Sequence, residues 1–342
     1  MARLWPFLVL LQHVAGHAVS EAGCLLQLKT RFTGKAVDIV HILSMGREAS
    51  CFVRDLVSVN GSHPTIHEPL GGLVEGHSII SMSAHRSDSA LQCLYDCHNC
   101  TVGAVNSGSY SNLQDYCKEV DGTSSSRPYL VIKTTRVVDH GALVRAVPPN
   151  YLASARFVVL LRDPRGVWSS TKPFVGWAIH SIPLICELLA LQALTLPELA
   201  SAVGPRLLIG IYERWTLNTA QFAGQIARLL DADLQQFLPV GKDGQRAKDE
   251  LLPPSWVTSL TTAELSQIEN DANCRAYMER VGYPAGSSNT SQIKSHSGLI
   301  SALTPKEEDV LHQLRAKQSA LQISANDLPE QMKLVFTPAK LR

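Results

Sequence analysis

The sequence predicts an α/β fold in a single domain, in which a doubly wound, mainly parallel sheet is flanked by helices. Short apolar runs recur along the chain, and each is followed by a polar segment and then by helical periodicity. The runs are continuous rather than alternating, which indicates strands that are buried on both faces and therefore paired in parallel. Alternation of strand and helix is typical of doubly wound sheets. A length of 342 residues suffices for one large domain of this kind.

Four runs are predicted as the strands of this sheet. The first, at 36–44, is rich in β-branched residues. The other three are too short to form independent helices, and they lie at 129–132, 157–161 and 207–211. No unit of 20 to 50 residues repeats along the chain, so a solenoid is not expected.

Capping residues and prolines mark the predicted helix boundaries. Asp139 caps a segment that ends near Val147, and Pro164 suits the first turn of another helix. Thr261 and Glu264 have the spacing of a capping box, which predicts one helix from there to about 280, ending before the glycine at 282. Further predictions are a helix capped at 87–88, packed helices rather than a membrane span at 182–203, a loose insertion at 101–128, and an amphipathic helix at 305–321.

The N-terminus resembles a secretory signal. A short basic start precedes an apolar stretch at 4–11, and small-residue cleavage patterns follow at 16–18 and 20–22. We therefore expect residues 1–22 to be a signal peptide or an uncleaved signal anchor, with a buried N-terminal helix as the alternative. Membrane association is expected only through such an anchor, because the apolar stretch is shorter than a membrane span.

Cysteine content and glycosylation sequons agree with the secretory route. The chain has 8 cysteines, an even number that permits disulfides whose pairing the sequence leaves open. Cys97 and Cys100 are spaced like a metal or redox motif, but no second pair at zinc spacing accompanies them, so we expect no metal. Asparagine sequons for glycosylation begin at Asn60, Asn99 and Asn289. The net charge of +1 argues against a nucleic-acid partner, which requires a basic excess.

The first candidate site follows the first predicted strand. A tight turn containing Arg47 leads into a helix that begins near Ser50. A strand, a turn and a helix in this order aim free backbone N–H groups at one point, which is a P-loop-like arrangement suited to phosphate. Arg47 adds positive charge, and the Ser50 hydroxyl adds a donor. The Gly-Lys-Ser/Thr ending of a Walker A loop is absent, and an ordinary strand-to-helix turn is the alternative.

The second candidate site follows the strand at 157–161. That strand delivers Arg162 to the carboxyl edge of the sheet, where ligands of open α/β folds bind. Asp163 and Pro164 then start a helix that carries Ser170 two turns along. An arginine fork and a hydroxyl converging in this way suit a phosphate dianion. The alternative is a surface Arg-Asp pair at a helix start.

In this order and spacing, the two segments resemble the donor-binding signatures of the Golgi carbohydrate sulfotransferases, in particular the galactose/N-acetylglucosamine 6-O-sulfotransferase group. The family's 5′-phosphosulfate loop, Arg-Ser-Gly-Ser-Ser-Phe, is matched by Arg47-Glu48-Ala49-Ser50-Cys51-Phe52. Its 3′-phosphate segment, Arg-Asp-Pro-Arg-Ala-Val followed by serine, is matched by Arg162-Asp163-Pro164-Arg165-Gly166-Val167 and Ser170. Further similar landmarks extend the resemblance over 36–284, leaving 285–342 as a C-terminal helix and tail; they are His67-Glu68-Pro69, Cys97, Lys133-Thr134-Thr135-Arg136, Ile211-Tyr212-Glu213, Trp256, Cys274 and Gly282-Tyr283.

The resemblance implies a PAPS-dependent transferase that moves a sulfuryl group to a sugar hydroxyl of a glycan or proteoglycan, the 6-OH of galactose, N-acetylgalactosamine or N-acetylglucosamine. It implies a protein of the Golgi lumen or a type II Golgi membrane protein, with a secreted form or a homodimer also compatible. Arg47, Ser50 and nearby backbone amides would hold the 5′-phosphate and the developing charge on the sulfonate, which gives Arg47 a catalytic role, and Arg162 and Ser170 would hold the 3′-phosphate. Glu68 would be the base, with His67 as the neighbour to exclude.

The phosphosulfate loop departs from the family pattern at two positions. Glu48 replaces a small residue, and it would repel the donor if it pointed inward. Ala49 replaces a glycine, and its Cβ disfavours a positive φ. These departures favour an alternative function, that of a catalytically impaired relative which binds a glycan or a partner. A P-loop kinase is a further alternative, which the missing Gly-Lys-Ser/Thr ending and the lack of an acidic magnesium motif disfavour.

Overall fold

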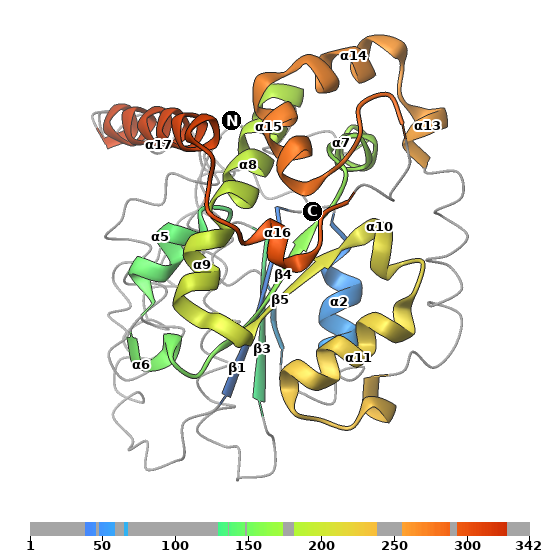
Figure 1. The fold of residues 1–342 in the computed structure, drawn as a ribbon, viewed down its shortest axis with the longest axis vertical. Helices are drawn as coiled ribbons and strands as arrows, with labels where there is room; N and C mark the ends of the chain where they lie inside the picture. The colour runs from blue at the N-terminus through green and yellow to red at the C-terminus, as the bar shows by residue number, and fades with distance from the viewer. Residues whose placement is uncertain are drawn as a thin grey trace, which may run out of the picture.

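The computed structural model describes residues 38–45, 48–58, 65–67, 129–135, 137–147, 149–173, 181–237, 255–287 and 293–326. Several sequence predictions lie outside these residues and stay predictions: the signal at 1–22, the helix capped at 87–88, the insertion at 101–128, the sequons, and the Cys97–Cys100 pair. Figure 1 shows a central sheet with helices on both sides.

The sheet is parallel throughout and has five strands in the order β2-β3-β1-β4-β5. Its strands are β1 (Asp38–Leu43), β2 (Thr65–His67), β3 (Tyr129–Thr134), β4 (Arg156–Leu161) and β5 (Leu207–Ile211). The predicted α/β fold and all four predicted strands are confirmed. The sequence analysis missed β2, because a strand of three residues is too short to show a pattern.

Side chains on the two faces of the sheet enter two separate cores. In β1, Ile39 and Leu43 pack on one face, whereas Val40 and Ile42 pack on the other. The first face is covered by α5 (His140–Ala146), α8 (Ile182–Leu194), α9 (Leu196–Val203) and α15 (Ala272–Val281), and the second by α2 (Ser50–Val57), α10 (Tyr212–Trp215) and α11 (Thr219–Leu230). Figure 1 shows α5 and α9 on one side of the strands and α2, α10 and α11 on the other. Burial on both faces explains why the strands read as continuous apolar runs.

The apolar stretch at 182–203 forms packed helices, as predicted. Residues Ile182–Arg206 are long and apolar enough to cross a membrane, but 72% of this segment's most apolar window is buried inside the protein. The stretch divides at Thr195, where α8 ends and α9 begins with Pro197 in its first turn. Thr195 Oγ1 accepts a hydrogen bond from His140 N at 3.0 Å, which joins this corner to the start of α5. The segment is therefore a pair of core helices.

The single helix predicted from 261 to about 280 is wrong, because two helices occupy this stretch. Thr261 and Glu264 form the predicted capping box, but α14 (Thr262–Asn270) ends before Asp271. Asp271 has ψ 131°, and its side chain accepts hydrogen bonds from Asn273 N and Cys274 N, so it caps α15. A capping aspartate inside the stretch restarts the helix at an angle. The predicted C-terminal boundary is confirmed, because Gly282, which has φ 94°, ends α15.

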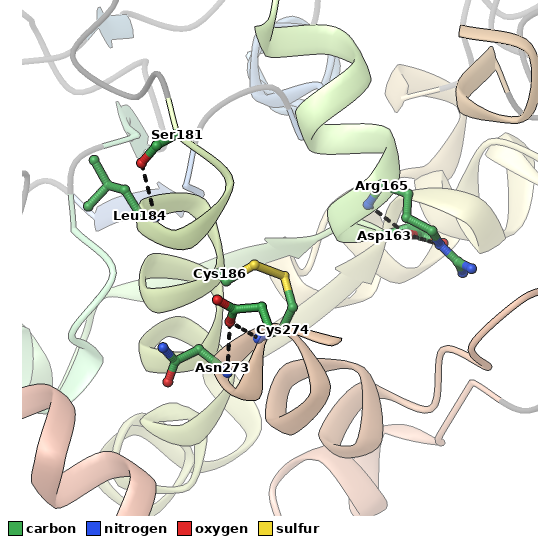
Figure 2. Close-up of a disulfide and its surroundings, with 8 residues drawn as sticks. Asp163, Arg165, Ser181, Leu184, Cys186, Asn273 and Cys274 are labelled. Atoms are coloured by element: carbon green, nitrogen blue, oxygen red, sulfur yellow. Dashed lines mark hydrogen bonds and ion pairs between the residues drawn. A yellow bond between two sulfur atoms is a disulfide. The ribbon is translucent and has the colours of Figure 1, made fainter. Parts of the chain in front are cut away.

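A disulfide joins α8 to α15. Cys186 and Cys274 are bonded, and both are buried beside Trp256, Ile182 and Ile268. Asp271 lies close to these two sulfur atoms, but sulfur in a disulfide is not a thiolate ligand, so this group offers no metal site. Figure 2 shows the bond together with the capping contacts of Asn273 and Cys274.

The C-terminal helix packs back onto the domain through ion pairs. The predicted amphipathic helix is α17 (Pro305–Asn326), and it runs slightly beyond the predicted 305–321. Arg315 on α17 pairs with Asp139 at 2.9 Å and with Glu198 at 2.8 Å. Asp139 also caps α5 as predicted, by accepting from Ala142 N. The remaining elements of the described residues are α6 (Pro149–Leu152), α7 (Pro164–Thr171), η2 (Gly204–Arg206), η3 (Leu234–Phe237), α13 (Ser255–Ser259) and α16 (His296–Leu299).

Candidate active site

The two candidate segments lie at the carboxyl ends of neighbouring strands. β1 and β4 pair directly, with Leu43 opposite Val159. From β1 the chain continues toward the β2 and β3 side of the sheet, whereas from β4 it continues toward β5. Such a reversal is a topological switch point, and the crevice there is where open α/β sheets bind ligands. The fold therefore brings together two segments that are more than a hundred residues apart in the sequence.

The loop after β1 turns sharply into α2. Ser44 N donates to Thr134 O at 3.1 Å, which ties the start of the loop to β3. Ala49 is the N-cap of α2 and has φ 60° and ψ 30°, and Ser50 is the first helical residue and is buried. A positive φ was the conformation that alanine was expected to disfavour, yet Ala49 adopts it, at a typical cost of about 1–2 kcal/mol. Ala49 thus adopts a conformation that glycine reaches without strain.

Glu48 points into the protein rather than toward solvent. Its side chain is fully buried, and Oε2 accepts hydrogen bonds from Met45 N at 2.7 Å and from Gln192 Nε2 at 3.2 Å. Gln192 also donates to Leu160 O at 2.8 Å, so α8 holds the carboxyl against β4. Burial raises the pKa of Glu48 to about 8, against the opposing hydrogen bonds and the nearby Arg162. The side chain is therefore mostly protonated at pH 7, which weakens the repulsion expected of an acidic residue in this loop.

Cys51 and Phe52 differ in their surroundings. Cys51 is an exposed free thiol on the first turn of α2. Phe52 is half-buried and stacks on Trp215 with 5.1 Å between ring centroids, and Trp215 in turn meets Tyr212 edge-on at 5.4 Å. Phe52 thus packs α2 against α10, while Cys51 stays accessible beside the loop.

The segment after β4 holds Arg162 at the sheet edge. Both backbone groups of Arg162 bond to one phenol, since Arg162 N donates to Tyr277 Oη at 3.2 Å and Tyr277 OH donates to Arg162 O at 2.9 Å. The half-buried guanidinium lies over the Tyr212 ring at 4.1 Å from its centroid. A Cβ on Gly166 would lie 3.0 Å from Arg162 Nε, so glycine leaves room for this side chain where the family carries alanine.

Arg165 and Asp163 form the buried support of this segment. Asp163 accepts from Arg165 N at 2.9 Å and caps α7. The guanidinium of Arg165 is fully buried, pairs with Asp163 at 2.7 Å and Glu269 at 2.9 Å, and lies 4.2 Å from the centre of the Trp256 ring. Figure 2 shows Arg165 folded back onto Asp163. Arg165 therefore binds the protein itself and fixes the start of α7.

Glu213 connects this support to the end of β5. Its Oε1 accepts from Asp163 N at 3.0 Å and its Oε2 from Tyr283 OH at 2.6 Å. Burial and the neighbouring Asp163 carboxylate raise the pKa of Glu213. Sequence reasoning noted Glu213 as a landmark but gave it no role, and it missed Gln192 and Tyr277 altogether. A glutamate two residues after a buried strand was the available signal.

The other predicted site residues are placed only in part. Ser170 is half-buried on α7, in the turn before its end. β2 ends at His67 and pairs with β3 in register with Lys133, so its carboxyl end meets the same edge of the sheet. Arg47 and Glu68 lie outside the described residues, and their roles stay predictions.

A cavity of about 200 Å³ lies outside both candidate segments. It runs along the outer edge of β5 between α11 and α16, and its lining includes Arg214, Asn218, Phe222 and His296. Arg214, which stands where the resembled family carries aspartate, donates to the backbone oxygens of Lys294 at 3.1 Å and of Ile293. Arg214 thus ties α10 to the segment before α16.

Searches with the sequence find no matching family model and no matching curated protein. Similar solved structures include the sulfotransferase domain of the Synechococcus PCC 7002 olefin synthase, with 16% identity over 88% of this chain and 99% of that chain and a TM-score of 0.41. The sulfotransferase domain from the curacin biosynthetic pathway has 13% identity over 82% of this chain and 99% of that chain, with a TM-score of 0.39. Mouse sulfotransferase SULT7A1 in complex with PAP has 12% identity over 86% of this chain and 89% of that chain, with a TM-score of 0.32. At these identities and TM-scores the likeness is distant, and by itself it assigns neither a family nor a ligand to this chain.

Proposed function

We propose that this protein is a sulfotransferase that moves a sulfuryl group from PAPS to a hydroxyl of a glycan, the 6-OH of a galactose, N-acetylgalactosamine or N-acetylglucosamine residue. The observation that carries the proposal is the pairing of β1 with β4 at the switch point of a parallel sheet. The two segments whose motifs suit the two ends of this nucleotide follow these strands, and Arg162 is held at that edge over Tyr212.

The residues at this edge fit an anionic nucleotide. Ala49 in the left-handed conformation, followed by helical Ser50, aligns successive backbone N–H groups into a concave donor set of the kind that binds phosphate. The mostly protonated state of Glu48 at pH 7 weakens the charge that would oppose an anion at that donor set. Arg162, fixed through its backbone by Tyr277, offers a guanidinium for the 3′-phosphate. Arg47 and Ser170 are proposed to complete the two phosphate contacts.

PAPS supplies the sulfuryl group as an activated donor. The protein's task is to position the donor and the acceptor and to stabilise the charge that develops in the transition state. Contacts at both ends of the nucleotide would fix its direction in the crevice, so that an acceptor hydroxyl meets the sulfur in line with the leaving group. Glu68 is proposed to take the proton from that hydroxyl, with His67 as the alternative base. Arginine and backbone amides supply the positive charge, so the proposal requires no metal.

The proposal includes a place in the secretory route. The buried Cys186–Cys274 disulfide supports an oxidising compartment, because such bonds are rare in a reducing cytosol. We propose the Golgi lumen, reached through the N-terminal segment as a signal peptide or as a type II anchor, and a glycan or proteoglycan as acceptor.

A second candidate function is a catalytically impaired relative that binds a glycan or a partner. The burial of Glu48 within the loop favours this candidate, because Glu48 occupies a backbone donor that a phosphate would otherwise use. Nucleotide binding without transfer would support it.

Transfer of labelled sulfate from PAPS to a panel of glycans, in the presence of a magnesium chelator, tests the proposal. We expect sulfated product on at least one acceptor with the wild-type protein. Glu68→Gln is expected to keep PAP affinity within about 3-fold and to lower turnover by 100-fold or more, because it removes only the base. Full activity of this variant would place the base at His67. PAP binding without product on any acceptor would favour the impaired relative.

A further inference from the structure

Among the described residues, one of the two carboxyl oxygens of Glu48 lacks a hydrogen-bond donor. Its Oε2 is satisfied by Met45 N and Gln192 Nε2, at 2.7 and 3.2 Å. Its Oε1 and the Oε1 of Gln192 are both buried, and neither has a hydrogen-bond partner within the part of the chain that the structure describes. Both orphaned atoms are acceptors when Glu48 is ionised. A proton on Glu48 removes the negative charge from this carboxyl, whose Oε1 would otherwise be a buried carboxylate oxygen without a donor, so burial favours the neutral form.

Among the described residues, the titratable groups that interact electrostatically with Glu48 come from three elements. Arg162, at the end of β4, attracts a negative charge on Glu48. Glu213 on α10 repels such a charge, and the phenol of Tyr277 on α15 is itself influenced by Glu48. Gln192, which α8 contributes, donates a hydrogen bond to Glu48 and carries no charge. Because burial outweighs the attraction of Arg162, the pKa of Glu48 rises to about 8, and the proton is lost just above neutral pH.

The hydrogen bond to Met45 N links this proton to the loop. Met45 is the second residue after β1, at the start of the loop that leads to the N-terminus of α2. An ionised carboxylate beneath the loop would hold this N–H more strongly, and it would place a negative charge beside Arg162. A phosphate dianion at the same edge would then meet repulsion and a partly engaged donor set.

We propose that Glu48 is an internal, proton-controlled competitor of the nucleotide, so that the loop accepts the anionic donor while this carboxyl is protonated and rejects it once the carboxyl ionises. This inference rests on the proposed function and adds a regulation of the same site. It makes the departure from the family's small residue a functional feature. The nucleotide and a proton would bind together above pH 8, and they would leave together.

Calorimetric titration of PAP at pH 7, 8 and 9 tests this inference, because both phosphates of PAP stay ionised across this range. We expect the wild-type Kd to rise about 10-fold between pH 7 and pH 9, as the fraction of neutral Glu48 falls. Glu48→Gln and Glu48→Ser, which remain neutral, are expected to show a Kd that changes less than about 2-fold over this range. Cys51→Ser removes the exposed thiol beside the loop, and it should retain the wild-type slope.

Proton uptake by the wild-type protein gives a readout that needs no variant. Titrations at pH 8.5 in buffers of different ionisation enthalpy should show net uptake of protons on PAP binding. A flat wild-type profile without proton uptake would overturn the inference and leave the proposed function standing. A slope that persists in Glu48→Gln would also overturn it, whereas a slope lost in Cys51→Ser would assign the effect to the thiol. Absence of PAP binding at every pH would overturn the proposed function as well.

Discussion

The segment after β4 and the loop after β1 lie side by side at one edge of the sheet, and they stabilise buried charge in different ways. After β4, the buried guanidinium of Arg165 is neutralised by Asp163 and Glu269, and the guanidinium of Arg162 lies over the Tyr212 ring. After β1, the buried carboxyl of Glu48 contacts only uncharged hydrogen-bond donors among the described residues, and burial raises its pKa to about 8, which favours the protonated form at neutral pH. The β4 segment is therefore expected to keep its charge state over a wide pH range, whereas the loop is expected to change near pH 8.

The two segments also differ in the backbone conformation with which each begins its helix. Asp163 and Pro164 start α7 with a favourable cap and a first-turn proline. Ala49 starts α2 in the left-handed region without a side-chain cap. The segment after β4 begins its helix with residues that favour a helix start, whereas the loop after β1 contains a strained backbone conformation and a buried carboxyl group. Such costs are typical of functional sites, which points to the loop as the part of the site where function constrains the sequence.

Arg165→Met should give the largest effect on stability. It leaves the carboxylates of Asp163 and Glu269 without their cation, and removal of one partner from a buried ion pair costs about 3–5 kcal/mol. Arg54→Met is the matched control on α2, because Arg54 pairs with the exposed Asp55 and should cost at most about 1 kcal/mol. Chemical denaturation measures both variants. Equal losses in the free energy of unfolding of the two variants would contradict the structural role of Arg165.

Glu48→Gln should stabilise the protein at pH 7.5. The folded-state pKa of about 8 lies above the unfolded value, so the folded protein retains a proton that the unfolded chain releases as the pH rises past 4.5. The contribution of Glu48 to stability is therefore lost progressively between pH 4.5 and 8, and glutamine avoids a cost on the order of 2–4 kcal/mol. Denaturation at pH 7.5 and at pH 4 checks this, since the gain should vanish at the lower pH. A gain of the same size at both pH values would show that ionisation is not its cause.

Ala49→Gly should raise the free energy of unfolding by a smaller amount, about 1 kcal/mol, because glycine adopts φ 60° without the strain imposed by a Cβ. The gain should be independent of pH, which separates it from that of Glu48→Gln. Thermal unfolding at pH 5 and pH 7.5 measures it. A loss of stability at both pH values would show that the Ala49 methyl group contributes packing that outweighs the strain.

The sequence was sufficient to predict the structural features that depend on local patterns. Strands buried on both faces appear as apolar runs, and β5 was predicted to the residue at 207–211. The break between α14 and α15 was missed because Asp271 is compatible with a helix until its side chain is seen to cap the next one. Segment order and motifs were enough to place Arg162 and the loop at one edge of the sheet.

The supporting contacts could not be predicted, because they join residues that are distant in the sequence. Gln192 and Glu48 are separated by 144 residues, and Tyr277 and Arg162 by 115. No periodicity or spacing marks such pairs, and only the packing of α8 and α15 on the sheet brings them together. The same packing turns Glu48 inward, and from sequence alone its charge could only be expected to oppose the donor.

Titration of PAP by calorimetry at pH 7, with a magnesium chelator present, tests the central claim most directly. The proposed nucleotide site predicts saturable binding by the wild-type protein. Arg162→Ala should weaken that binding by about 30-fold or more, because it leaves the 3′-phosphate without its guanidinium. Arg145→Ala, an exposed cation in the last turn of α5, should bind PAP as the wild type does. Absence of binding by the wild-type protein, or an affinity unchanged in Arg162→Ala, would contradict the claim that this edge of the sheet binds the nucleotide.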